Sequence, residues 1–303
     1  MLRETPVRFV VGSRQLLAVP RRLLVVNHPL DRLVAGQAAP LPDLPPDADG
    51  YRVLSAPAAT VPRLLAACPD MVPGGLQRYR RHYIAMEGGF ERYMAGFSGK
   101  TRSTLRRKQR KFAEADGGRL DIREYRGAAG LDEFLAAALP LSRRTYQGKY
   151  LGAGLPEGAD ELQALHVAAA EDRLRCFILY LEGKPASYLC LPVEGRTLVY
   201  AWLGYDPETA HLSAGTVLQL AALERLFAED RFDLFDFTEG DGPHKALFGT
   251  ASIEAASFLL LRKRATNRVL LGALRMFDDS VAAGKRIAQR SGALAGARRL
   301  LRA

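Results

Sequence analysis

Four ionisable side chains lie within seven residues in the segment 238–245, which reads TEGDGPHK. The carboxylates of Glu239 and Asp241 are separated by one glycine, and His244 and Lys245 follow. A carboxylate that is partly buried beside another carboxylate has a raised pKa, which is how proteins tune a general base. The pattern therefore predicts acid–base chemistry, with Glu239 or Asp241 as base and Lys245 as a substrate anchor. A salt-bridged or capping turn with a structural histidine is the alternative.

A second candidate site lies where an expected strand leads through a turn into an expected helix. Residues 197–205, TLVYAWLGY, are β-branched and aromatic and end at an Asp-Pro pair, which is typical of a strand that stops in a turn. Apolar residues then recur at helical spacing, and Ser213 is placed to cap that helix. The backbone N–H groups of residues 213–217 would lie at a helix N-terminus, where a pyrophosphate can bind. An ordinary crossover with a polar loop is the alternative.

Positive charge is concentrated in two segments. The chain carries 43 basic and 33 acidic residues, a net charge of +10. Residues 98–111 hold seven of the basic residues and the tail after Asp279 holds six, without an acid in either segment. In the first segment Arg102, Arg106 and Arg110 recur on one helix face, a row that suits phosphates or carboxylates. A solvated helix face is the alternative, and charge this local is unlike that of a protein that binds nucleic acid over its whole surface.

Length and composition predict a globular protein. With 303 residues, 48% of them hydrophobic, the chain can bury one large core or two modest ones. Cys68, Cys176 and Cys190 lie far apart and outside any CxxC or CxxH pattern, which argues against a disulfide framework and against a zinc site. The sequence has neither an apolar run of about 18 residues nor a signal-peptide pattern. We therefore expect a cytoplasmic protein without a metal and without a membrane span.

The expected elements give an α+β architecture in three parts. Residues 1–95 contain a hairpin, a Pro-rich loop and two strands flanking a short helix, and they predict a small α/β scaffold domain. Residues 96–264 contain a basic helix, a strand, a helix interrupted by Pro140, a further helix and a three-strand meander that ends with residues 197–205. The helix of the second candidate site and a buried strand at residues 232–237 follow. Residues 265–303 predict a basic helical tail that packs against the body or a second subunit, or contacts an anionic membrane surface peripherally.

This order of elements resembles a GNAT acetyltransferase domain. Within that family it is similar to the CelD-type branch, which is associated with cellulose and exopolysaccharide biosynthesis and is related to the FemAB transferases. The resemblance covers residues 98–263 and rests on SGKTRSTLRRKQRKF, SRRTYQ and the ordered series WLGYDPE, SAGTVLQLAALERLF and FDFTEGDGPHKALF. It implies a mixed α/β GNAT acyltransferase fold, in which a mostly antiparallel, splayed central sheet is flanked by helices, plus the smaller N-terminal α/β half-domain.

The resemblance also implies a donor site in a V-shaped opening between the strands 197–205 and 232–237. The donor would be an acyl-CoA, expected to be acetyl-CoA, with its pyrophosphate on the turn before the helix. That turn, HLSAGT, keeps one glycine where the family motif usually has Gly followed two residues later by Gly or Ala. The expected donor contacts are Trp202, Leu203, Ser213, Ala214, Gly215, Thr216 and Val217, and the expected acceptor contacts are Arg102, Arg106, Tyr146 and His244.

Acyl transfer also requires a group that protonates the departing thiolate. Tyr146, Tyr200 and Tyr205 are the candidate phenols near the expected opening. Phe248 stands where many GNAT enzymes have a tyrosine, and it cannot donate a proton.

The leading functional prediction is a GNAT-family N-acetyltransferase. It would move an acyl group to an amine or hydroxyl of a polar, saccharide-related acceptor by direct attack of the acceptor on the thioester. Aminoacyl transfer from tRNA, as in the FemAB relatives, is the second prediction, favoured by Lys245 and the basic helix. A non-catalytic nucleic-acid-binding protein is the third, although no aromatic-interleaved basic strand and no helix-turn-helix pattern accompany the basic segments. We expect a small-molecule or saccharide partner and no specific nucleic acid, with the oligomeric state open.

Overall fold

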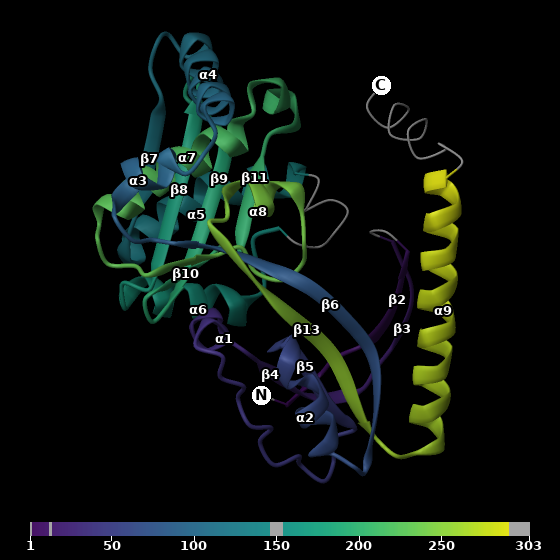
Figure 1. Cartoon of the computed structure of the whole chain (residues 1–303). Coiled ribbons are helices and arrows are strands. Elements are labelled where there is room, and N and C mark those ends of the chain that lie inside the picture. Colours follow the sequence, from purple (N-terminus) through teal and green to yellow (C-terminus); the bar gives the residue numbers. More distant parts are fainter. Residues whose placement is uncertain (1, 12–13, 146–153, 291–303) are drawn as a thin grey trace. The chain divides into compact units, whose positions relative to one another are not determined.

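The computed structural model describes residues 2–11, 14–145 and 154–290 and divides the chain into two compact units (Figure 1). Unit 1 combines Met1–Tyr79 with Glu254–Ala303, and unit 2 is Arg80–Ile253. The C-terminal segment is therefore grouped with the N-terminal residues. Two strands, β6 (Met71–Ala85) and β13 (Ala251–Arg262), contain the boundaries between the units.

Unit 1 contains a small sheet in the order β1–β4–β5–β13, in which only β4 and β5 are parallel among the described pairs. Its helices are α1 (Leu30–Val34), α2 (Val61–Ala66) and α9 (Ala265–Arg290). Leucines 270, 271 and 274 of α9 pack with Val7 and Phe9 in a buried cluster, so the predicted helical tail covers β2 over its described residues. The remaining strands are β1 (Leu2–Glu4), β2 (Val7–Val11), β3 (Arg14–Val19), β4 (Arg22–Asn27) and β5 (Gly50–Pro57), and β2 pairs with β3 as the predicted hairpin.

Unit 2 is built on a sheet in the order β6–β12–β10–β9–β8–β7, with β11 paired to β9. Every described pair is antiparallel except β10 with β12. This is the mostly antiparallel sheet that the sequence predicted. The strands are β7 (Asp121–Tyr125), β8 (Leu174–Leu181), β9 (Lys184–Glu194), β10 (Thr197–Val199), β11 (Trp202–Tyr205) and β12 (Leu234–Asp236).

Helices cover both faces of this sheet. The helices are α3 (Gly89–Ala95), α4 (Gly99–Ala115), α5 (Gly127–Arg144), α6 (Ala159–Ala170), α7 (Ala214–Ala228) and α8 (Pro243–Phe248). Helices α3, α4 and α7 share one buried cluster with Phe177 and Leu179, and α5 and α6 share another with Cys176 and Ile178. Successive residues of β8 thus face opposite helix layers, which explains why the strand is apolar on both faces from Cys176 to Leu181.

One helix differs from its prediction. We expected Pro140 to interrupt α5, but the helix continues through it to Arg144. A proline removes one helical hydrogen bond and usually kinks or breaks a helix. Here the neighbouring Ala138 and Leu141 are buried in the α5–α6 cluster, and this packing holds the helix together.

The sheet of unit 2 splays where β10 gives way to β11. Val199 is the last residue of β10 in register with β12, opposite Asp236, and Tyr200 N–H donates to Asp236 O at 2.9 Å. Ala201 N–H then turns back to Val199 O, also at 2.9 Å. Beyond this irregularity β11 pairs with β9 alone among the described strands. The chain beyond Tyr200 and the chain beyond Asp236 therefore separate and leave room for a ligand between them.

None of the helices in the described ranges combines the length and the apolar character needed to cross a bilayer.

Candidate functional site

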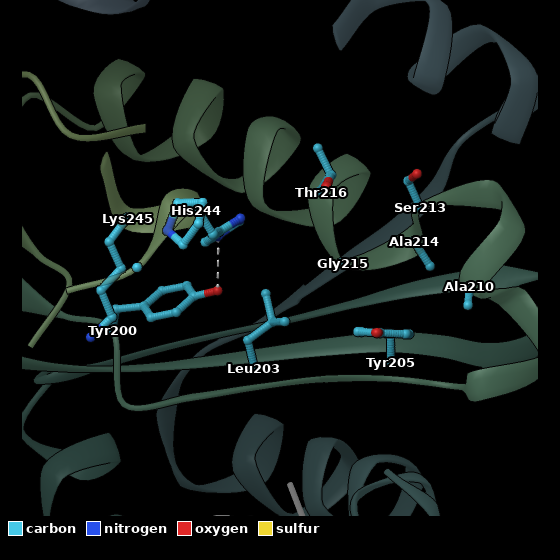
Figure 2. A pocket seen from close by; sticks show the side chains of 12 residues that line it. Tyr200, Leu203, Tyr205, Ala210, Ser213, Ala214, Gly215, Thr216, His244 and Lys245 are labelled. Carbon is cyan, nitrogen blue, oxygen red and sulfur yellow. Dashed lines mark hydrogen bonds between the residues drawn. The ribbon is translucent and has the colours of Figure 1, made fainter. Parts of the chain in front are cut away.

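A pocket of about 490 Å³ lies in unit 2 beside the point where the sheet splays (Figure 2). Three chain segments line it: the strand region with Tyr200, Leu203 and Tyr205, the start of α7 at residues 213–216 with Ala210 just before it, and the start of α8 at residues 242–245. The fold therefore brings into one cavity the two segments that the sequence marked as separate candidate sites.

The first turn of α7 offers backbone N–H groups to this pocket. Ser213 N–H donates to Ala210 O, and the N–H groups of Thr216 and Val217 both donate to Ser213 O, at 2.9 and 3.1 Å. Five backbone N–H groups, at residues 213–217, were predicted to bind a pyrophosphate. Three of them already donate within the chain, so the N–H groups of Ala214 and Gly215 are the anion donors at the positive end of the helix. Ser213 occupies the N-cap position, but its side chain makes no capping bond, because its backbone is left-handed (φ 58°) and not extended.

Gly215 brings the bare backbone of α7 against β11. A Cβ atom on Gly215 would lie 3.2 Å from Leu203 Cδ2 and 3.4 Å from Tyr205 Cδ1. A side chain at this position would therefore occupy pocket space that only glycine leaves open. This arrangement suits a ligand whose phosphates approach the main chain closely.

The opposite side of the pocket holds a partly buried polar cluster around His244. Its Nε2 lies 2.6 Å from Gln219 Oε1 and 3.4 Å from the hydroxyl of Tyr200, and the side chains of Tyr200 and His244 point toward each other (Figure 2). Burial lowers the pKa of His244, and the positive charges of Lys108 and Lys245 lower it further. Burial also raises the pKa of the Tyr200 phenol. At neutral pH the imidazole is therefore uncharged and the phenol keeps its proton.

Lys245 also lines the pocket, and its Nζ donates to the carbonyl oxygen of Glu239. Burial lowers the pKa of Lys245, with the opposing effect of Asp236 and a further lowering by Arg81. A cation that is partly desolvated in this way can bind an anionic or strongly polarised group of a substrate.

The two predicted carboxylates lie outside the lining of the pocket. Glu239 is exposed, and Asp241 is also exposed, with its Oδ1 2.9 Å from His82 Nε2. The turn that carries them is bent by left-handed backbone at Thr238 (φ 62°) and Gly240 (φ 87°). The imidazole and the ammonium group of this segment, and neither carboxylate, reach the pocket.

The predicted donor contacts also include residues that line the pocket and residues that do not. Leu203 lines the pocket, whereas Trp202, the next residue toward the N-terminus, packs against the α5–α6 cluster on the other face of the sheet. This follows from the alternation of side chains along a strand. The side chain of Val217 is buried in the core, and only its backbone belongs to the turn.

The basic helix α4 approaches the site with its lysines and not with its arginines. Arg102 donates to the carbonyl oxygens of Ala95 and Phe97, at 3.1 and 2.6 Å, and Arg106 is exposed. Lys111 Nζ instead donates to His211 O at 3.1 Å, two residues before Ser213, and Lys108 carries one of the charges that lower the pKa of His244. Tyr146, a predicted acceptor contact, lies outside the described residues.

Two participants were missed by sequence reasoning, namely Gln219 and the lysines of α4. Gln219 had a detectable signal, because it is the one polar residue in the run AGTVLQLAAL apart from Thr216. A fully buried glutamine in such a run needs a polar partner. No group of three or more His, Cys, Asp and Glu side chains in the described ranges is placed to hold a metal ion.

Comparison with known proteins places this site in a family context. Residues 99–246 match the model of the acetyltransferase (GNAT) domain family, whereas no curated protein matches the chain in sequence. Among solved structures, FemX is similar with a TM-score of 0.55 and 11% identity, over 88% of this chain and 90% of FemX.

Two further structures show weaker similarity. They are the C-terminal domain of a putative lysylphosphatidylglycerol synthetase from Agrobacterium fabrum (TM-score 0.49, 11% identity, 75% of this chain and 72% of that chain) and L-PGS from Bacillus licheniformis (0.46, 12%, 75% and 73%). Similarity at these identities concerns the fold. The matched family model, the splayed sheet and the pocket at the start of α7 agree, and residues 99–246 form a GNAT-type acetyltransferase domain.

Proposed function

We propose that this chain transfers an acyl group from acyl-CoA, with acetyl-CoA as donor, to an amine or hydroxyl of a polar acceptor by direct attack on the thioester. The observation that carries the proposal is one pocket that joins the Ala214 and Gly215 amides to the His244–Tyr200 pair. A donor anchored by its phosphates at the start of α7 would present its acyl end to the polar cluster along Leu203. Acyl transfer needs both an anion anchor and proton-transfer groups within reach of each other.

Lys245 is proposed to anchor the acceptor, because it lines the end of the pocket formed by α8. The proposal of a saccharide-related acceptor rests on the CelD-type resemblance of the motifs described above. A saccharide offers hydroxyl or amino nucleophiles together with polar groups that a lysine can bind.

Calorimetric titration tests the donor. We expect acetyl-CoA and coenzyme A to bind with similar affinity, because both carry the phosphates that the α7 amides would hold. Total yeast tRNA serves as the competing ligand at 50 and 200 mM NaCl. Binding of tRNA with a steep salt dependence, together with no heat from acetyl-CoA, would refute the acyl-CoA proposal.

Aminoacyl transfer from tRNA is the second candidate. It is supported by the similarity in fold to FemX and by the seven basic residues in 98–111. The same titration separates the two candidates, since an RNA donor adds many phosphate contacts beyond the pocket and a nucleotide thioester does not.

The lysines of α4 give a further prediction. The double variant Lys108→Met/Lys111→Met is expected to weaken coenzyme A binding about tenfold at low salt, because two cations near a phosphate ligand each contribute up to about 1 kcal/mol at the surface. Titrations at 50 and 200 mM NaCl measure the loss and its screening. Arg107→Met/Arg110→Met removes the same charge from exposed positions of α4 and is the matched control. Equal losses in both pairs would assign the effect to overall charge.

A further inference from the structure

We propose that His244 is the group that accepts the proton of the attacking nucleophile, and that Gln219 is the positioning residue that sets its tautomer. This inference rests on the proposed acyl transfer and names the base of that reaction. It replaces the exposed carboxylates of the 238–245 turn with a partly buried imidazole that lines the pocket.

Gln219 lies in the middle of α7, between Leu218 and Leu220, and is fully buried. Its Oε1 is 2.6 Å from His244 Nε2, whereas its own Nε2 has no hydrogen-bond partner within the described part of the chain. A buried amide with an unsatisfied amino group destabilises a core. Leucine at this position would avoid that cost, but it would lack the contact that the glutamine makes with His244.

The contact between Gln219 Oε1 and His244 Nε2 fixes the position of the imidazole proton, because an amide oxygen can accept a hydrogen bond but cannot donate one. The imidazole proton must therefore lie on Nε2, and the lone pair lies on Nδ1. The same logic applies to histidines that are fixed by a second partner in metal sites and catalytic sites. Gln219 thus prepares His244 as a proton acceptor.

The position of the proton on His244 Nε2 also determines how the Tyr200 hydroxyl can hydrogen-bond. Its oxygen lies 3.4 Å from the protonated Nε2 and serves as a second, weaker acceptor. Its own hydroxyl hydrogen cannot point to that nitrogen, so it is available to the pocket that Tyr200 lines. A phenol kept protonated by burial can donate to the carbonyl oxygen as negative charge develops there.

The ring of His244 is held rigidly, and its charge state suits a base. Its centroid lies 4.9 Å from that of Phe248 and 6.3 Å from that of Phe237. The charged and titratable groups around it are Lys108 from α4, Lys245 from α8 and Tyr200 from the strand region. Burial, and then the two cations, lower the pKa of His244 and keep the imidazole neutral at neutral pH, which is the form that accepts a proton.

The step balances without a further reactant. His244 Nδ1 takes the proton as the acceptor nitrogen or oxygen bonds to the thioester carbon. The carbon–sulfur bond then breaks, the departing thiolate receives the proton from the imidazolium, and the imidazole returns to its neutral form. The products are the acylated acceptor and a free thiol.

Two measurements on the full chain test the assignment. Two-bond ¹H–¹⁵N spectra of histidine-labelled protein report the tautomer, and His244→Gln identifies the signals of this residue among the five histidines. We expect the Nε2–H tautomer in the parent and a mixture of tautomers in Gln219→Met, which preserves shape and removes the acceptor. Gln163→Met, at an exposed position of α6, is the matched control and should leave the spectrum of His244 unchanged. An Nδ1–H tautomer in the parent would overturn the role of Gln219.

Thiol release from acetyl-CoA, with glucosamine and with water as acceptors, gives the rate at pH 5 to 9. We expect losses of about 10² to 10⁴-fold in His244→Gln and about tenfold or more in Gln219→Met, with the affinity for acetyl-CoA retained. The acidic limb should lie below pH 6.5 in the parent and move to higher pH in Gln219→Glu, since an added anion favours the imidazolium. A loss that follows Glu239→Gln or Asp241→Asn while His244→Gln keeps the parental rate would return the base to the carboxylates. Failure of acetyl-CoA to bind would instead refute the proposed function, whatever the tautomer.

Discussion

Replacing Gly215 by glutamate is expected to weaken acetyl-CoA binding by about a hundredfold, which corresponds to about 3 kcal/mol. A Cβ atom there would lie 3.2 Å from Leu203 Cδ2, so the longer side chain must project into the pocket. Its carboxylate would compete with the donor phosphates for the Ala214 and Gly215 amides, which favour one anion at this helix end. Calorimetric titration of the purified variant measures the change in dissociation constant.

Two controls separate charge from bulk. Gly215→Ala adds only the Cβ atom and is expected to have a small effect, since the neighbouring leucine methyl group can move by a few tenths of an ångström. Gly284→Glu adds the same charge at an exposed position of α9, where a Cβ atom would meet no neighbour within 4 Å. Parental affinity in Gly215→Glu would show that the donor phosphates lie elsewhere.

Removing the carboxylate of Asp236 is expected to destabilise unit 2 by about 3 to 5 kcal/mol. Arg81 Nε donates to Asp236 Oδ1 at 3.0 Å and its Nη2 contacts Oδ2, with side-chain exposures of 7% and 1%. Asp236 Oδ1 also accepts from Thr238 N–H at 2.8 Å, which ties the end of β12 to the 238–245 turn. Asp236→Ala would leave a buried guanidinium without this counter-charge.

Urea unfolding followed by the fluorescence of Trp202, the one tryptophan, reports this change in unit 2. Arg81→Met/Asp236→Leu removes both charges and should recover part of the loss. Glu157→Ala breaks the exposed pair with Arg143 and should cost less than about 1 kcal/mol. A loss in Asp236→Ala no larger than that of Glu157→Ala would contradict the structural role of the pair.

The parts of the fold that sequence reasoning anticipated are those set by local pattern. The hairpin of β8 and β9, part of the predicted meander, turns through Glu182 and Gly183, both at positive φ. The apolar residues that recur at helical spacing after Ser213 likewise predicted the position of α7. In contrast, we predicted no element for residues 251–262, which form β13. Its partner β5 lies about two hundred residues earlier, with Ala255 opposite Pro57, and no local signal indicates such a pairing.

In the candidate site, too, local residue patterns predicted some features and the folded backbone determined the others. The turn before α7 and the segment 238–245 were recognised from residue types, and Leu203, Gly215, His244 and Lys245 line one pocket. Which side chains of 238–245 enter that pocket depends on backbone torsions at Thr238 and Gly240, which composition does not determine. The roles of these residues stay predictions until the variants above are measured.

Within the described part of the chain, every residue that lines the pocket lies between Tyr200 and Lys245, in one uninterrupted stretch. A single synthetic gene fragment can therefore replace or randomise this described lining while the codons for the remaining elements stay untouched. Selection for new acyl donors or acceptors can use one mutagenic cassette, and chimaeras with other members of the fold need only two junctions, one at each end of this stretch.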